Sequence, residues 1–169
     1  MKNRRAIYKG RVIEVWQENK LLPNGRRVRL DIVRHPGAVL IAPFLHPDRI
    51  ILLKQFRPVV NAYLYELPAG TIDKGETPLV CARREVIEET GFSAAKFKLL
   101  GKIYPVPGYS TEKISIYKAQ ELTRKVKAGD PDEIIECYVF NKAEVRRLFK
   151  KGRIIDAKTI VGLAWCGWI

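Results

Sequence analysis

Residues 70–92 read G-T-I-D-K-G-E-T-P-L-V-C-A-R-R-E-V-I-E-E-T-G-F, a loop that starts at a glycine and leads into a short acidic helix. Thr77 is a favourable N-cap residue, and Pro78 suits the first helical position because an N–H there would have no helical partner. Gly91 suits the left-handed conformation that commonly follows the last helical residue. The sequence therefore predicts a helix over residues 78–90.

Three carboxylates share one face of this predicted helix, because Glu85, Glu88 and Glu89 are spaced i, i+3, i+4. Like charges at such spacing cost about 0.2–0.5 kcal/mol per pair, and Arg84 precedes Glu88 in the less favourable order, so it relieves the repulsion only in part. An ordinary solvated acidic face is one explanation. A bound divalent cation is the other, and oxygen ligands without a neighbouring Cys or His favour Mg²⁺ or Mn²⁺ over Zn²⁺. Cys81 is expected to be a small buried apolar residue rather than a ligand.

Length and composition indicate one soluble globular protein. The chain has 169 residues, of which 47% are hydrophobic and 29% charged. No apolar run approaches the roughly 20 residues of a membrane span, and no apolar signal region follows the charged N-terminus. The cysteines, Cys81, Cys137 and Cys166, are odd in number and scattered, which predicts a reducing cytoplasmic setting rather than a disulfide framework.

The formal net charge of +13 would attract polyanions, either nucleic acid or a small phosphorylated substrate. The basic residues are dispersed along the chain, and no aromatic-rich RNA-binding signature lies among them. We therefore expect a generally basic surface and no nucleic-acid partner.

Elsewhere the pattern of apolar residues predicts a sheet followed by helices. Residues 11–17 and 28–33 alternate around a Pro23-Asn24-Gly25 turn and predict an N-terminal hairpin. Further strands are predicted over residues 38–44, 50–56, 63–67, 98–104, 114–119 and 134–140, and further helices over 142–150 and 157–164. The prediction is an α/β fold in which a mixed sheet has helices on both faces, preceded by a small N-terminal antiparallel β section.

The acidic segment resembles the Nudix box, G-x5-E-x7-R-E-U-x-E-E-x-G-U, where U is an aliphatic or aromatic residue. Every fixed position is filled, by Gly70, Glu76, Arg84, Glu85, Glu88, Glu89 and Gly91. The resemblance implies an α/β/α sandwich with the box as a loop-helix-loop. It also implies hydrolysis of a nucleoside diphosphate linked to another group, by attack of water on phosphorus.

Roles follow from the resemblance by position. Glu85 and Glu89 would be the primary ligands of Mg²⁺ (or Mn²⁺), Glu88 a further one, and the backbone carbonyl of Ala69 another contact. Arg84 would orient the glutamates.

Segments outside the box resemble the ADP-ribose pyrophosphatase branch, and together they span most of the chain. They are residues 35–39, 54–57, 65–70, 105–112 and 156–159. This implies cleavage of ADP-ribose to AMP and ribose 5-phosphate. Hydrolysis of other nucleoside diphosphate sugars such as GDP-mannose is the nearest alternative, and a nucleoside triphosphate or RNA 5′-end pyrophosphohydrolase is a more distant one.

Candidate substrate and catalytic residues come from these segments. Arg57 is a fixed cation that could clamp a phosphate, and Glu66 is assigned with it to substrate binding. Glu112 could accept hydrogen bonds from ribose hydroxyls or hold metal-bound water. The branch has a loop glutamate as candidate general base in this region, which implies Glu133, with Glu136 as its rival. Reach to the attacking water is what identifies the base.

The branch also assigns a role to the N-terminal section. Residues 1–36 would form a β section that packs across a two-fold axis and completes the partner's nucleotide site, and residues 37–169 would form the catalytic domain. A homodimer is therefore expected. Arg29 and Arg34 become candidates for substrate contact, with ordinary solvated arginines as the alternative.

Overall fold

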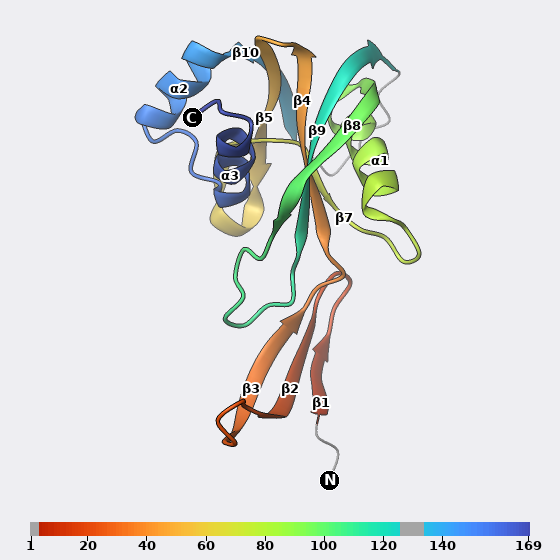
Figure 1. Cartoon of the computed structure of the whole chain (residues 1–169), viewed down its shortest axis with the longest axis vertical. Helices are drawn as coiled ribbons and strands as arrows, with labels where there is room; N and C mark the ends of the chain where they lie inside the picture. The colour runs from red at the N-terminus through yellow and green to blue at the C-terminus, as the bar shows by residue number, and fades with distance from the viewer. Residues whose placement is uncertain (1–3, 126–133) are drawn as a thin grey trace.

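The structure, a computed structural model, describes residues 4–125 and 134–169. A mixed sheet lies between helices on its two faces, as Figure 1 shows. Helix α1 (Pro78–Thr90) covers one face, and helices α2 (Lys142–Lys150) and α3 (Ala157–Trp165) cover the other. The predicted α/β/α sandwich is thereby confirmed. None of the helices within the described ranges has the length and apolar character that crossing a membrane requires.

The main sheet has seven strands in the order β10-β5-β4-β9-β8, with β6 paired to β5 and β7 paired to β4. Only β4 and β9 run parallel among these described pairs, so the sheet is mixed. The strands are β4 (Ala38–His46), β5 (Arg49–Arg57), β6 (Ala62–Glu66), β7 (Ala69–Thr71), β8 (Phe92–Ile103), β9 (Ile114–Arg124) and β10 (Ile135–Asn141), with the short helix η1 (Pro58–Val60) between β5 and β6.

Strand β4 organises both halves of the core because successive side chains point to opposite faces of a sheet. Val39 and Ile41 pack with Cys81, Ala82 and Val86 of α1. On the other face Leu40, Ala42 and Phe44 pack with Leu163 and Trp168 near the C-terminus. The predicted helix and its buried cysteine therefore pack against β4, an apolar strand buried on both faces, as is typical of a central strand.

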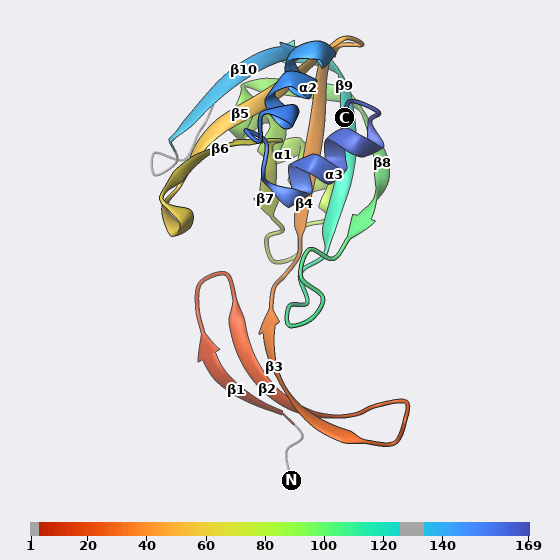
Figure 2. The same cartoon turned by 90° about the vertical axis from the view of Figure 1, so that its left-hand side faces the viewer.

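The N-terminal section is a three-stranded antiparallel sheet of β1 (Arg4–Lys9), β2 (Glu14–Leu21) and β3 (Arg27–Arg34). It stands away from the body of the molecule, as Figure 2 shows. The predicted antiparallel section is confirmed, but the prediction that it consists of a two-stranded hairpin was wrong. Strand β1 is added, and its almost wholly exposed side chains give no alternating pattern to detect.

Several predicted strand limits were also wrong. The second strand covers residues 14–21 rather than 11–17, because Gly10 N–H donates to the Ile13 carbonyl and closes a turn there. Strand β8 begins at Phe92 rather than Lys98, directly after Gly91 (φ 73°) reverses the chain. Strand β9 continues to Arg124.

Candidate active site

Helix α1 begins and ends at the predicted residues. The Thr77 hydroxyl accepts a hydrogen bond from Val80 N–H, and Gly91 is left-handed with its N–H bonded to the Ile87 carbonyl. Cys81 is fully buried on the face of α1 that packs against β4, and burial raises the pKa of its thiol to about 12, helped by the charges of Glu76 and Glu85. It stays a protonated apolar residue, as the sequence predicted.

Arg84 lies at the centre of the acidic face. Its Nη1 donates to Glu85 Oε1 at 2.7 Å and to Glu88 Oε2 at 2.9 Å. Its Nε and Nη2 donate to the two oxygens of Glu76, each at 3.1 Å. Hydrogen bonding to Glu76, followed by the charge of Glu85, raises the pKa of Arg84. Arg84 therefore contacts Glu85 as well as Glu88 on the helix, and the preceding loop brings Glu76 to it.

Two further carboxylate contacts join the helix to β7. A Cβ added to Gly70 would lie 1.8 Å from Glu85 Oε1, so the glycine leaves the space that this carboxylate occupies. Glu89 is 4% exposed and its Oε2 accepts from Ala69 N–H at 2.8 Å. Within residues 4–125 and 134–169, no three His, Cys, Asp or Glu side chains form a group that could hold a metal ion as they stand. The Arg84 guanidinium contacts both Glu85 and Glu88.

A second charged cluster lies at the end of β6. Glu66 is 1% exposed and accepts two hydrogen bonds from Arg57, from Nε at 2.8 Å and from Nη2 at 2.7 Å. Lys158 Nζ donates to Glu66 Oε2 at 2.6 Å and to Asp156 Oδ1 at 2.8 Å. Burial alone would raise the pKa of Glu66, but hydrogen bonds from Arg57 and the charge of Lys158 lower it. The hydrogen bond to Glu66 raises the pKa of Arg57.

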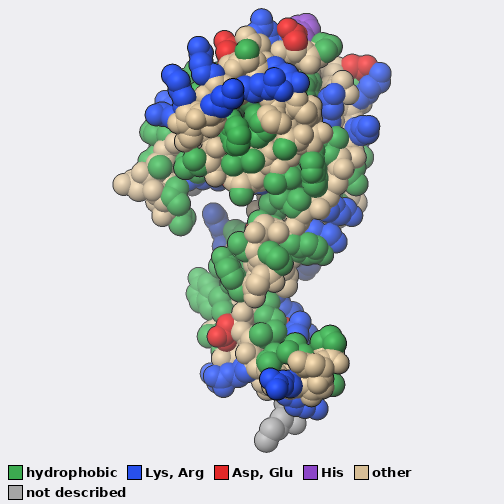
Figure 3. All heavy atoms as spheres, turned by 60° about the vertical axis from the view of Figure 1, so that its left-hand side comes forward, with side chains coloured by type: hydrophobic (Ala, Val, Ile, Leu, Met, Phe, Trp, Pro, Cys, Tyr) green, Lys and Arg blue, Asp and Glu red, His purple; other side chains and the backbone are tan. Residues whose placement is uncertain are grey.

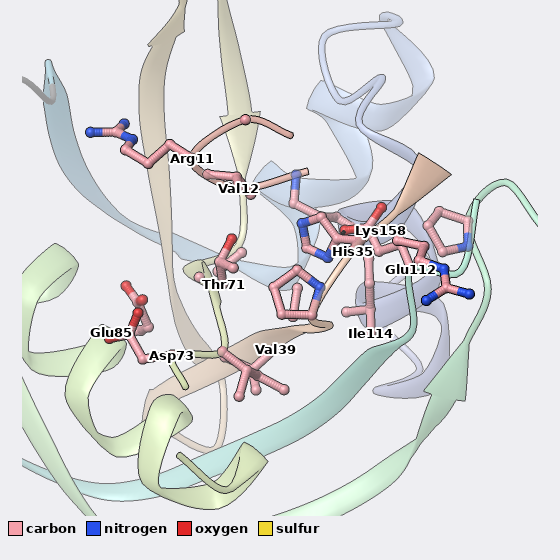
Figure 4. A pocket seen from close by; sticks show the side chains of 18 of the residues that line it. Arg11, Val12, His35, Val39, Thr71, Asp73, Glu85, Glu112, Ile114 and Lys158 are labelled. Carbon is pink, nitrogen blue, oxygen red and sulfur yellow. Dashed lines mark ion pairs between the residues drawn. The ribbon is translucent and has the colours of Figure 1, made fainter. Parts of the chain in front are cut away.

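The two clusters face one cleft of about 1220 Å³. In Figure 4, Glu85 lies on one side, and Glu112 and Lys158 lie on the other. The floor comes from the start of β4 and from β7, and Arg57 also lines the cleft. Figure 3 shows the molecule hollowed between the body and the N-terminal sheet, with Lys and Arg side chains gathered at the top of the body and along one edge.

Glu112 reaches the cleft through a loop that is tied to strand β3. Val33 N–H donates to the Tyr109 carbonyl at 2.8 Å, and Thr111 N–H donates to the Val33 carbonyl at 2.9 Å. The Glu112 carboxylate is 3.9 Å from Nδ1 of His35, which also lines the cleft. The N-terminal sheet and the Glu112 loop are thus held together.

The structure separates the two arginines predicted on β3. Arg34 lines the cleft, forms an ion pair with Glu18 and lies over the Trp16 ring at 4.5 Å from its centroid. Arg29 is exposed and is not among the described residues that line the cleft. Glu133 lies outside the described residues. Its rival Glu136 is an exposed β10 residue bonded to Lys54 and to the Tyr138 hydroxyl.

Comparison with known proteins then decides the family. The model of the NUDIX domain matches residues 34–161, well over half of the chain. The chain belongs to the Nudix family.

Its relatives cover nearly its whole length. The methanol dehydrogenase activator of Bacillus methanolicus and the ADP-ribose pyrophosphatase of Bacillus subtilis (strain 168) are each 34% identical to it over 161 residues, 94% of this chain and 87% of theirs. The crystal structure of an ADP compounds hydrolase superposes with a TM-score of 0.83 at 25% identity, over 97% of this chain and 89% of that one. This chain is a Nudix hydrolase.

Sequence reasoning gave no site role to several charged residues that line the cleft of this Nudix hydrolase, among them Arg11, Asp156 and Lys158. Arg11 lies in the β1–β2 turn, and Asp156 and Lys158 lie at the start of α3. A basic turn residue among 31 lysines and arginines carried no signal of its own. The Asp156–Thr159 segment was singled out only as part of a resemblance, and its contact with Glu66 spans 92 positions in the sequence.

Proposed function

We propose that this Nudix hydrolase uses Mg²⁺ or Mn²⁺ to hydrolyse ADP-ribose to AMP and ribose 5-phosphate. One observation carries the proposal: Arg84 and Glu85 of α1 line the same cleft as Arg57 and Glu112. Such a cleft can hold a pyrophosphate between cation-binding oxygens and a fixed arginine. The similarity to an ADP-ribose pyrophosphatase and to an ADP compounds hydrolase supports the choice of substrate.

The carboxylates suit a divalent cation. Glu85 Oε1 and Glu88 Oε2 already converge on one cationic group, Nη1 of Arg84, at 2.7 and 2.9 Å. All the donors are oxygens, the ligand type that Mg²⁺ and Mn²⁺ prefer. We assign Glu85, Glu88 and Glu89 to the metal, with the Ala69 carbonyl as a further contact. A bound cation would supply Lewis acidity and neutralise charge on the pyrophosphate.

The protein's own residues position the reactants. Arg84 would orient the Glu85 and Glu88 carboxylates, and Arg57 would donate to a phosphate oxygen. Glu112, on the opposite wall, would accept from ribose hydroxyls. In the reaction, the oxygen of one water molecule becomes bonded to one phosphorus and the bridging oxygen leaves with the other. Glu133 stays the predicted base for the proton of that water.

We also propose a homodimer in which residues 1–36 complete the site of residues 37–169 in the partner. Support comes from exposed apolar side chains on the N-terminal sheet, Ile7, Tyr8, Leu21 and Leu30. Arg29 lies away from the cleft of its own chain, so it could contact substrate only in such a dimer. Light scattering after gel filtration tests this; a monomer at working concentration would refute it. The scattered cysteines support a cytoplasmic location.

A substrate comparison tests the activity. Purified protein with Mg²⁺ is incubated with ADP-ribose, GDP-mannose and ATP, and products are separated by anion-exchange chromatography. We expect AMP and ribose 5-phosphate from ADP-ribose with the highest kcat/KM. Intact ADP-ribose beside rapid cleavage of GDP-mannose would reassign the substrate while leaving the reaction type in place.

A further inference from the structure

The cluster at the end of β6 contains a lysine that no part of the proposed reaction uses. Lys158 and Arg57 both donate to the same oxygen, Glu66 Oε2, at 2.6 and 2.7 Å. Lys158 is itself held by Asp156 Oδ1 at 2.8 Å. Both Lys158 and Arg57 line the cleft, whereas Glu66 is buried behind them.

This arrangement fixes the plane of the Arg57 guanidinium. A guanidinium carries five N–H donors in a rigid fork, and Glu66 takes two of them, one on Nε and one on Nη2. Within residues 4–125 and 134–169 the other three donate no hydrogen bond, and the Arg57 side chain is 38% exposed. They are the donors available to a phosphate. Their direction is set by the orientation of the Glu66 carboxylate, because the fork binds it through both oxygens.

Lys158 holds that carboxylate in place. Its ammonium occupies a position on Oε2 that Arg57 does not, so rotation of the carboxylate would break contacts with both cations. Thr159, the next residue, fixes the start of α3 to the same strand end, since its hydroxyl accepts from Leu67 N–H at 2.8 Å. The lysine is therefore attached to a rigid part of the fold.

We propose that Lys158 is a positioning residue that acts through Glu66 to aim Arg57 at the phosphate of the substrate. The inference rests on the proposed function insofar as that function assigns Arg57 to a phosphate. The cluster has two cations and two carboxylates, so its formal net charge is zero. The cluster therefore contributes by fixing the direction of the Arg57 donors more than by electrostatic attraction of the substrate phosphate.

The first experiment needs no substrate. The ¹H–¹⁵N resonance of Arg57 Nε, assigned with an Arg57→Lys variant, is recorded in the ligand-free protein. We expect a sharp, slowly exchanging signal in the wild type and in Lys158→Arg, and a broadened, faster-exchanging signal in Lys158→Met. Lys96→Met, which removes an exposed ion pair with Glu121, is the matched control and should leave the signal unchanged. An unaltered signal in Lys158→Met would overturn the proposal, even if ADP-ribose proves not to be the substrate.

The second experiment is a double-mutant cycle in kcat/KM for ADP-ribose. We expect Lys158→Met and Arg57→Ala each to lower kcat/KM about ten-fold or more. Because Lys158 acts through Arg57, the double variant should be within about two-fold of Arg57→Ala alone. Effects that multiply would show that Lys158 acts independently of Arg57 and would overturn the proposal.

A charge-balanced variant separates position from electrostatics. Asp156→Asn with Lys158→Met keeps the formal charge of the cluster at zero and retains an N-cap residue at the start of α3. We expect it to be as impaired in kcat/KM as Lys158→Met alone, with Lys158→Arg restoring most of the activity. Recovery in the charge-balanced variant would mean that only net charge matters, which contradicts a positioning role.

Discussion

The two charged clusters that face the cleft are built in opposite ways. The Arg84 cluster joins residues at most 13 positions apart, all within the loop and helix of the Nudix box. The Glu66 cluster joins Arg57 and Lys158 across the sheet, with 92 positions between Glu66 and Lys158. The Arg84 cluster comes from one local sequence motif, whereas the Glu66 cluster forms only when β6 and α3 pack together.

They also differ in their exposure to water. The Glu88 side chain is about a third exposed, whereas that of Glu66 is almost completely buried. A partly solvated carboxylate can exchange an arginine for a metal ion at small cost, while a buried one must keep its partners. From this comparison we infer that the Arg84 cluster takes part directly in metal binding, whereas the Glu66 cluster positions Arg57.

The largest expected effect breaks the Arg84 cluster. Glu85→Gln removes the negative charge of one of the two carboxylates that accept from Arg84 Nη1. It also removes a proposed metal ligand. We expect kcat for ADP-ribose to fall about 100-fold or more, with little change in the thermal midpoint. Glu121→Gln, in an exposed ion pair on β9, is the control and should retain activity. Near-normal turnover in Glu85→Gln would remove that residue from the metal site.

Breaking the Glu66 cluster should instead lower stability. Glu66→Gln leaves Arg57 and Lys158 without their shared carboxylate, and we expect a loss of about 2 kcal/mol in the free energy of unfolding because both cations can still reach water. Urea unfolding measures this loss. A change below about 0.5 kcal/mol would show that the buried carboxylate contributes nothing net.

The same variant has a defined pH dependence. The folded-state pKa of Glu66 is lowered below its ordinary 4.5, so its contribution is present above that value and disappears as pH falls through the folded pKa. The difference in unfolding free energy between wild type and Glu66→Gln should be constant from about pH 8 to pH 5 and shrink below about pH 4.5. A difference that grows on acidification would reverse the sign of the proposed shift.

These contrasts explain what could be predicted from the sequence. The helix over residues 78–90 was predicted to the residue because its cap, proline and terminal glycine act locally. Strand β1 was missed because its exposed side chains do not alternate. The Lys158–Glu66 pair was missed for a different reason: an ion pair between residues 92 positions apart leaves no periodic pattern in the sequence. Glu66 was predicted to bind substrate, yet the structure places it behind Arg57 and Lys158.

A smaller effect sharpens the role of packing within the Arg84 cluster. Gly70→Ala would place a Cβ 1.8 Å from Glu85 Oε1, so the carboxylate must move. We expect apparent Mg²⁺ affinity in the activity assay to fall about ten-fold, in the range seen when a ligand's surroundings change. Gly108→Ala is a suitable control because nothing lies within 4 Å of its added Cβ and its φ is not positive. Equal Mg²⁺ dependence in both variants would show that Glu85 can relocate freely.

The smallest expected effects concern the helix N-termini on which the clusters depend. Thr77 caps α1 through one 3.4 Å contact with Val80 N–H, so Thr77→Ala should cost about 0.5 kcal/mol, at the low end for caps. Asp156 caps α3 through Thr159 N–H at 3.0 Å and also binds Lys158, so Asp156→Ala should cost about 1.5 kcal/mol. Urea unfolding of both variants gives the order directly. A larger loss for Thr77→Ala would mean that the local motif, and not the long-range cluster, depends more on its cap. Since Thr77 makes one long cap contact and Asp156 makes two shorter contacts, the cap of α1 should be the more dispensable of the two.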